Sequence, residues 1–259
     1  MTQKTQIPGI TTAIRAETRK FRRSLVGIVG TLALVIGTLA LLAGITAGVA
    51  NGNPELKAKA GPAAVLNWSG LLSGAAQITA AGGLIGFGVV LAWLVGREFT
   101  DGTISGLFGL PVSRGHIALA KLIVYALWAL VVGTVLALGI LVLGLGMQYG
   151  VPDVESWRGL GRQWVLTVLT AGLVTPVAWL ATVTRSVLAA VGGAIGVTIL
   201  SQVGALAGAG GWLPFAAPAL WSMSGGTEVN VIQLALPVVV ALIGAGATWA
   251  AWSRLELDR

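Results

Sequence analysis

The sequence of 259 residues contains no cysteine, a single histidine (His116) and few charges, since Asp, Glu, Lys and Arg together make up only 10% of it. Without cysteine there are no disulfide bonds, thiolate nucleophiles or cysteine metal sites, and a lone histidine argues against a zinc site. Soluble domains usually contain about 25% charged residues. The shortage of charge, beside 56% hydrophobic residues, excludes an ordinary soluble protein.

Motifs for catalysis are also missing from the sequence. No glycine-rich loop ends in Gly-Lys-Ser or Gly-Lys-Thr, and no His-Glu-x-x-His is present, so neither the P-loop of many ATPases nor that zinc-protease motif occurs. The Trp-Ser-Met-Ser-Gly around Ser224 is faintly similar to an intramembrane serine protease, but Ser224 and His116 fall on opposite sides of the predicted membrane and cannot share a proton. We therefore predict no catalytic, cofactor-binding or metal-binding residue in this chain.

Long apolar runs take the place of a soluble core. Six of them approach or exceed the roughly 20 residues that a helix needs to cross a bilayer; they occupy residues 24–50, 71–96, 117–147, 163–184, 187–207 and 231–252. The first run is too long for the apolar core of a signal peptide, which has about 7–15 residues. The sequence predicts an all-α membrane protein with six transmembrane helices, and it predicts loops at 51–70 and 148–162.

Lysine and arginine are distributed unevenly between the two sides that alternating spans define. With the N-terminus in the cytoplasm, twelve of the sixteen basic residues face the cytoplasm, and the four that face outward are Lys57, Lys59, Arg158 and Arg162. The positive-inside rule therefore places both termini in the cytoplasm. We predict an interfacial amphipathic helix within residues 1–23, a transmembrane domain at 24–252 and a cytoplasmic tail at 253–259.

The predicted spans carry no Asp, Glu, Lys or Arg except near their ends. A charge in mid-bilayer is costly and usually marks an ion or proton path, so its absence argues against a proton-coupled carrier. Internal repeats, which many secondary transporters contain, are not evident either. A membrane enzyme acting on lipid would need clustered acid or histidine side chains, and Glu98, Asp101 and His116 are too few for that. A self-sufficient carrier or channel stays open as the alternative to a transporter subunit.

Residues 10–23 form an amphipathic pattern. Ile10, Ile14 and Phe21 fall on one face, with Glu17 among them, and the opposite face holds Arg15, Arg19, Arg22 and Arg23. Apolar side chains under a basic face are typical of a helix that lies on an anionic membrane surface. The alternative is a basic flank that merely orients the first span.

The segment between the second and third spans carries a short apolar patch. Ile104, Leu107 and Phe108 recur at helical spacing, Pro111 would end that helix, and Ser113 is a plausible N-cap for the third span. An apolar face toward the cytoplasm indicates either a docking element for a partner or a loop resting on the bilayer. Physical reasoning alone leaves both interpretations open.

The same segment resembles the signature of the ABC type-2 export permease family. The matching elements are Glu98, the pair Gly102-Thr103, the run Leu110-Pro111-Val112-Ser113-Arg114, and Lys121 at the start of the third span. Residues 15–20 resemble the opening elbow helix of that family. Residues 212–215, with Pro218 and Trp221, resemble its outer re-entrant segment. One feature fits less well, because Gly102, Gly106 and Gly109 make the segment a poor intrinsic helix.

The resemblance implies how such a chain works and with what. Two permease chains, identical or different, would form a pathway, and two copies of a separate ATPase subunit would bind ATP and Mg. A coupling helix at 100–110 would dock on the ATPase through Leu107 and Phe108, and Glu98 with Arg114 would form a hinge or salt bridge. The implied coupling residues are Glu98, Asp101, Gly102, Thr103, Ile104, Leu107, Phe108, Pro111, Arg114 and Lys121, and those of the elbow are Ile14, Glu17, Lys20 and Phe21.

The cargo is indicated only as a class. Spans rich in Ala, Gly, Leu, Val and Trp favour a hydrophobic or amphipathic substrate, such as a drug, a peptide antibiotic or a lipid. The Ala- and Gly-rich composition hints at a bacterial plasma membrane. The net charge of +7 is explained by orientation in that membrane, so nucleic acid is not an expected partner.

Overall fold

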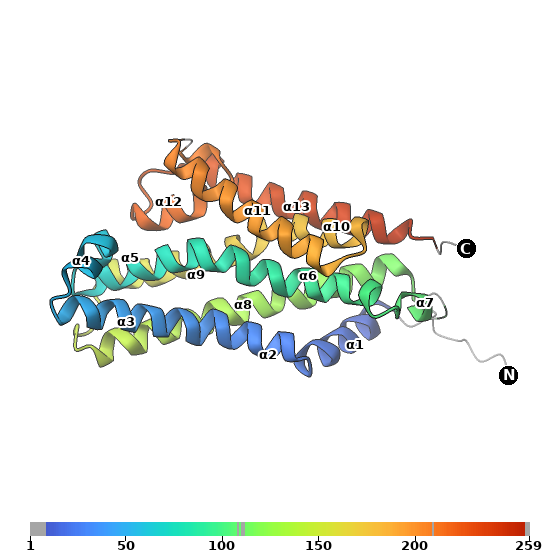
Figure 1. Cartoon of the computed structure of the whole chain (residues 1–259), viewed down its shortest axis with the longest axis horizontal. Coiled ribbons are helices and arrows are strands. Elements are labelled where there is room, and N and C mark those ends of the chain that lie inside the picture. Colours follow the sequence, from blue (N-terminus) through green and yellow to red (C-terminus); the bar gives the residue numbers. More distant parts are fainter. Residues whose placement is uncertain (1–8, 108, 110–111, 209, 257–259) are drawn as a thin grey trace.

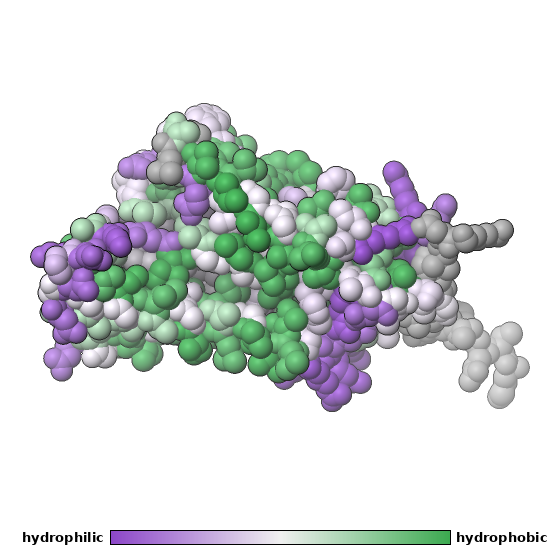
Figure 2. Space-filling model, viewed as in Figure 1, coloured by the Kyte–Doolittle hydropathy of each residue, from purple (hydrophilic) through white to green (hydrophobic). Residues whose placement is uncertain are grey.

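The computed structural model describes residues 9–107, 109, 112–208 and 210–256, and all regular elements in these ranges are helices (Figure 1). Six helices are long and apolar enough to cross a membrane: Leu25–Ala50, Trp68–Thr100, Arg114–Gly146, Val154–Thr184, Val187–Ala205 and Val231–Ser253. The predicted all-α protein with six spans is thereby confirmed. An apolar band lies between two hydrophilic ends of the molecule (Figure 2).

The first span is preceded by a separate helix, as the amphipathic pattern predicts. Helix α1 (Ile10–Arg22) buries Ala13, Glu17 and Phe21, and Ser24 then caps the next helix by accepting a hydrogen bond from the Gly27 backbone N–H. The span itself consists of α2 (Leu25–Leu32), a π-helical segment η1 (Ala33–Gly37) and α3 (Thr38–Ala50). Ser24 therefore marks the boundary between α1 and the first span.

The loop predicted at 51–70 is wrong in part. It contains α4 (Pro54–Ala60) and the 3₁₀ segment η2 (Gly61–Ala64). Asn53 caps α4 through the Leu56 N–H, and Pro54 occupies a first-turn position where its missing N–H costs nothing. The turn residues read from the sequence thus start a short helix instead of a continuous loop.

The second span is longer than its apolar run. It joins α5 (Trp68–Ile78), a π-helical segment η3 (Thr79–Gly83) and α6 (Leu84–Thr100). Asn67 caps its start, so the helix begins before Leu71, and its end continues through the charged residues Arg97 and Glu98. The third span, α8 (Arg114–Gly146), begins at the predicted N-cap Ser113.

The fourth span corrects the predicted loop at 148–162, because α9 (Val154–Leu173) already begins within it. Asp153 caps α9, and Glu155 pairs with Arg158 and Arg162 along its polar first turns. Because these side chains are polar, the sequence pattern predicted a loop here, although the helix begins before the apolar run. Helix α10 (Thr175–Thr184) completes the span after a break at Val174, with Pro176 in its first turn.

The fifth span, α11 (Val187–Leu206), follows a tight turn in which Arg185 adopts a left-handed conformation, with φ 52°. A 3₁₀ turn η4 (Gly210–Trp212) and α12 (Ala217–Met223) then lead to the sixth span, α13 (Val231–Ser253). Helix α12 contacts α5, α9 and α13. Its assignment as a re-entrant segment stays a prediction.

The second and fourth spans form the centre of the bundle. They bury 56% and 61% of their most apolar stretch, against 22–28% in the other four spans. The main core gathers around Phe87, Leu91 and Leu94 of α6 and extends to Trp252 of α13. Helix α1, the C-terminal end of α13 and the short helix α7 (Ile104–Leu107) lie at one end of the bundle, opposite α4 and α12 (Figure 1).

Candidate functional site

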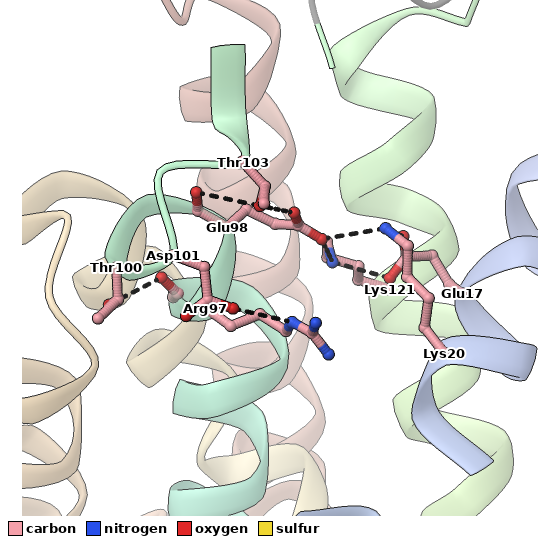
Figure 3. A network of polar contacts seen from close by, with 9 residues as sticks. Glu17, Lys20, Arg97, Glu98, Thr100, Asp101, Thr103 and Lys121 are labelled. Carbon is pink, nitrogen blue, oxygen red and sulfur yellow. Dashed lines mark hydrogen bonds and ion pairs between the residues drawn. The ribbon is translucent and has the colours of Figure 1, made fainter. Parts of the chain in front are cut away.

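Four charged side chains from three helices meet beside α7, and we call them the charge cluster: Glu17 and Lys20 of α1, Glu98 of α6 and Lys121 of α8 (Figure 3). The Lys121 ammonium lies 2.7 Å from Glu17 Oε2 and 3.0 Å from Glu98 Oε1. Lys20 Nζ lies 3.1 Å from Glu17 Oε1 and 3.2 Å from Glu98 Oε1. Each ammonium therefore bridges both carboxylates.

Three of the four side chains in the cluster are buried. Lys121 is 0% exposed, and Glu17 and Glu98 are 3% exposed. Removing such charges from water is expensive, and only opposite charges with good hydrogen-bond geometry offset that cost. Two carboxylates and two ammonium groups balance here. The second oxygen of Glu98 accepts a hydrogen bond of 2.6 Å from the Thr103 hydroxyl, so both of its oxygens are used.

Lys20 is the half-exposed member. Burial on its own would lower the pKa of its ammonium, but the carboxylates of Glu17 and Glu98 outweigh that effect, and the pKa is raised above 10.5. Lys20 therefore keeps its charge at physiological pH, and it lies on the side of the cluster that is open to solvent.

Aromatic rings hold the three helices in this arrangement. Phe21 of α1 meets Trp128 of α8 edge to face, with 5.5 Å between ring centroids. On the other side, the Lys121 ammonium lies 6.0 Å from the ring of the fully buried Trp252, which itself contacts Phe99 edge to face. The Trp252 N–H donates to the Thr182 hydroxyl at 2.9 Å. The fourth and sixth spans are thus tied to the same place.

The predicted coupling helix at 100–110 is shorter than expected. Thr100 is the last residue of α6, Gly102 turns the chain with φ 68°, and α7 is a single turn from Ile104 to Leu107. Phe108, Leu110 and Pro111 lie outside the described residues. The glycines of the segment account for its short helix, because each one weakens helix formation.

Leu107, for which the resemblance implies a docking role, is largely covered by the chain itself. Its side chain is 8% exposed and belongs to the chain's own core, against which Ile104 also packs. Among the described residues of this segment, the exposed ones are polar or small, namely Asp101, Gly102, Thr103, Ser105, Gly106 and Gly109.

Arg114 and Glu98 have different partners from those predicted. Glu98 pairs with Lys121 and Lys20, while the Arg114 guanidinium donates a hydrogen bond to the Leu255 carbonyl oxygen just after α13. Asp101 lies 3.8 Å from Arg97, whose guanidinium stacks over Trp93. Arg114 therefore joins the start of the third span to the end of the sixth.

Sequence reasoning found the members of the cluster but not their contacts. It named Glu17, Lys20, Glu98, Thr103 and Lys121 separately, in an elbow and a coupling segment. The available signal was Glu17, an acid among the apolar positions of an amphipathic helix, which calls for a buried cation. Trp252 and Thr182 were missed, since nothing local distinguishes them from ordinary span residues.

Within the described residues no group of three or more His, Asp or Glu side chains is placed to hold a metal ion. The charges of the cluster pair with one another and so connect α1, α6 and α8 next to α7.

Comparison with known proteins gives one family match. A family model described as an ABC-2 family transporter protein matches residues 13–201, which extend from α1 into α11 and include the whole charge cluster and α7. No curated protein matches the chain.

Proposed function

Because the chain belongs to the ABC-2 family of transporter proteins, we propose that it is the permease subunit of an ATP-driven exporter and is powered by a separate ATPase subunit. Members of this family normally pair with such a subunit. The chain is a multi-pass membrane protein of six spans. Its sequence has no P-loop, so ATP and Mg would be bound by the partner.

The observation that carries the proposal is the charge cluster next to an exposed turn of helix. The ATPase would contact the outward face of α7, formed by residues such as Asp101, Ser105 and Gly106. A push on α7 would reach the second span through the Thr103–Glu98 hydrogen bond, and the third span and α1 through Lys121. Leu107 would transmit the same movement into the core, against which it packs.

Two such chains would enclose the substrate pathway. The fifth and sixth spans bury only 22% of their most apolar stretch, so they offer ample apolar surface to a second permease chain and to the cargo. That second chain would be identical or a sister permease. An apolar lining favours a hydrophobic or amphipathic cargo, such as a drug, a peptide antibiotic or a lipid. The end of the bundle with α1 and α7 would face the cytoplasm of a bacterial plasma membrane.

Co-purification with an ATPase tests this proposal. The tagged chain is expressed together with the products of its neighbouring genes, purified in detergent, and assayed for vanadate-sensitive ATP hydrolysis. We expect an ATPase subunit to co-purify with the wild-type chain. The bulky change Ser105→Trp on the exposed face of α7 should abolish that association. The matched change Ala58→Trp, on an exposed position of α4 at the opposite end, should leave it intact.

The alternative function is a carrier or channel that works alone. Reconstitution of the purified chain into vesicles separates the two functions, because a carrier or channel would move solutes without any ATPase. Transport by the chain alone would count against the exporter proposal. Equal ATPase binding by the Ser105→Trp and wild-type chains would contradict the contact proposed at α7.

A further inference from the structure

An apolar groove of about 510 Å³ opens on the membrane-facing side between α1, α2 and α8, and we call it the acyl groove. Its walls are Ile28 and Leu32 of α2 and Leu127 and Val131 of α8, which are 49–58% exposed. Phe21 and Trp128 also line it, in edge-to-face contact with each other. Hydrocarbon therefore surrounds nearly all of this space.

The polar groups of Trp128 and Thr31, which lie in the acyl groove, already have partners. The Trp128 indole N–H donates to the Thr31 hydroxyl at 2.8 Å, and that hydroxyl donates to the Gly27 carbonyl oxygen at 2.7 Å. These hydrogen bonds leave neither the indole N–H nor the hydroxyl hydrogen available to an occupant. The acyl groove is thus suited to an alkyl chain rather than to a polar ligand.

At its α1 end the acyl groove continues into a basic depression of about 560 Å³. Thr18 and Arg22 border both spaces, and the depression is further lined by Ile14, Arg15, Arg19 and Arg23. Among the described residues none of these four arginines has an ion-pair partner, whereas Lys20 on the same helix has two. In Figure 2, hydrophilic residues gather over α1 beside the apolar surface of the first span.

We propose that this composite site binds one anionic phospholipid, with an acyl chain in the acyl groove and the phosphate at Arg19 and Arg22. The guanidinium fork is well matched to phosphate oxygens, and it supplies the charge that a neutral lipid would leave unbalanced. The occupant lies at the bend between α1 and the first span, on the opposite side of α1 from the charge cluster. It would therefore hold the elbow helix against the bundle, a role distinct from that of transported cargo.

Native mass spectrometry of the purified full-length chain tests the site. The probes are dioleoyl phosphatidylglycerol and dioleoyl phosphatidylcholine, which share their acyl chains and differ in headgroup charge, with sn-glycerol 3-phosphate as the headgroup alone. The charge variant is Arg19→Gln with Arg22→Gln, and the groove variant is Val131→Trp. Their matched controls are Lys57→Gln with Lys59→Gln on α4, and Leu41→Trp on an exposed position of α3.

The wild-type chain should retain one phosphatidylglycerol with about tenfold preference over phosphatidylcholine, because each basic side chain near an anionic headgroup adds a severalfold factor. The charge variant should lose the preference, and Arg19→Lys with Arg22→Lys should largely keep it. Val131→Trp should lose both lipids while its thermal midpoint stays unchanged. Both controls should match the wild-type chain.

Four results would overturn the proposal. They are equal retention of the two lipids by the wild-type chain, a preference that survives loss of both arginines, and full displacement of the lipid by sn-glycerol 3-phosphate. The fourth is a lipid-free dimer that Val131→Trp dissociates, which would assign the acyl groove to a second copy of the chain. If the charge variant does not fold, the lysine pair and Val131→Trp decide the outcome.

Discussion

At the scale of single residues, Lys121 is the member of the charge cluster with no exposure to solvent and with both carboxylates as partners. Lys121→Met would leave Glu17 and Glu98 buried close together without their central cation. Breaking a buried pair in this way costs about 3–5 kcal/mol. We expect a marked fall in the thermal midpoint of the purified chain in detergent, measured by tryptophan fluorescence or by size-exclusion after heating.

Two further variants separate the lost ion pairs from lost packing. Lys20→Gln removes a cation whose side chain is 42% exposed, and it should cost only about 0.2–1 kcal/mol, as exposed pairs do. Glu17→Gln added to Lys121→Met removes one uncompensated carboxylate and should recover part of the lost stability. A double variant as unstable as the sum of its single changes would contradict the coupling inferred here.

At the scale of elements, Gly244 of α13 lies where the sixth span crosses the break in the fourth. A β-carbon on Gly244 would come within 2.5 Å of the Thr175 hydroxyl oxygen and 2.6 Å of the Pro176 nitrogen. Backbone atoms cannot move aside easily, so Gly244→Ala should destabilise the chain by about 1–3 kcal/mol. Gly246→Ala in the same helix meets nothing within 4 Å and should be neutral or slightly stabilising in the same melting assay.

The link between α7 and the second span rests on the Thr103 hydroxyl, which donates to Glu98. Thr103→Val keeps the side-chain shape and removes the donor, whereas Thr103→Ser keeps it. In the complex with its ATPase we expect Thr103→Val to retain the partner but to lower substrate-stimulated ATP hydrolysis severalfold, since a hydrogen bond to a charged group contributes about 1.5–3 kcal/mol. Thr103→Ser, which keeps the hydroxyl donor, should retain the stimulated ATP hydrolysis. Equal stimulation in both variants would remove this hydrogen bond from the coupling route.

The centres of the six spans were predictable, whereas their ends were not. Apolar runs mark where helices lie in lipid, so all six positions were found. The ends depend on caps and polar first turns, such as Asn67 before the second span and Asp153 before the fourth. Asp153 stands before charged residues that resemble a loop in composition. The short α7 shows the opposite effect, because the family resemblance implied a helix over residues 100–110 and the segment forms a single helical turn.

At the scale of the whole molecule, the sequence predicted how many spans there are but not which ones are neighbours. That the second and fourth spans form the centre follows from long-range packing, for example the buried contact of α6 with α11 and of α10 with α13. The contact of Glu17 with Lys121, 104 positions apart, is likewise a long-range contact that the sequence pattern does not predict. One acid on an apolar face indicates that a buried cation is needed, but it does not identify that cation.

Orientation in the membrane is the property of the whole molecule that the distribution of charge predicts most directly, and the lack of native cysteine makes it easy to test. Ser105→Cys on α7 and Ala58→Cys on α4 are both at exposed positions, at opposite ends of the bundle. On intact cells stripped of any outer envelope, a membrane-impermeant maleimide should label the Ala58→Cys chain only. After permeabilisation it should label both, while Leu91→Cys in the core should stay unlabelled. Labelling of Ser105→Cys from outside would show that the chain has the opposite orientation. An ATPase in the cytoplasm could then not reach α7.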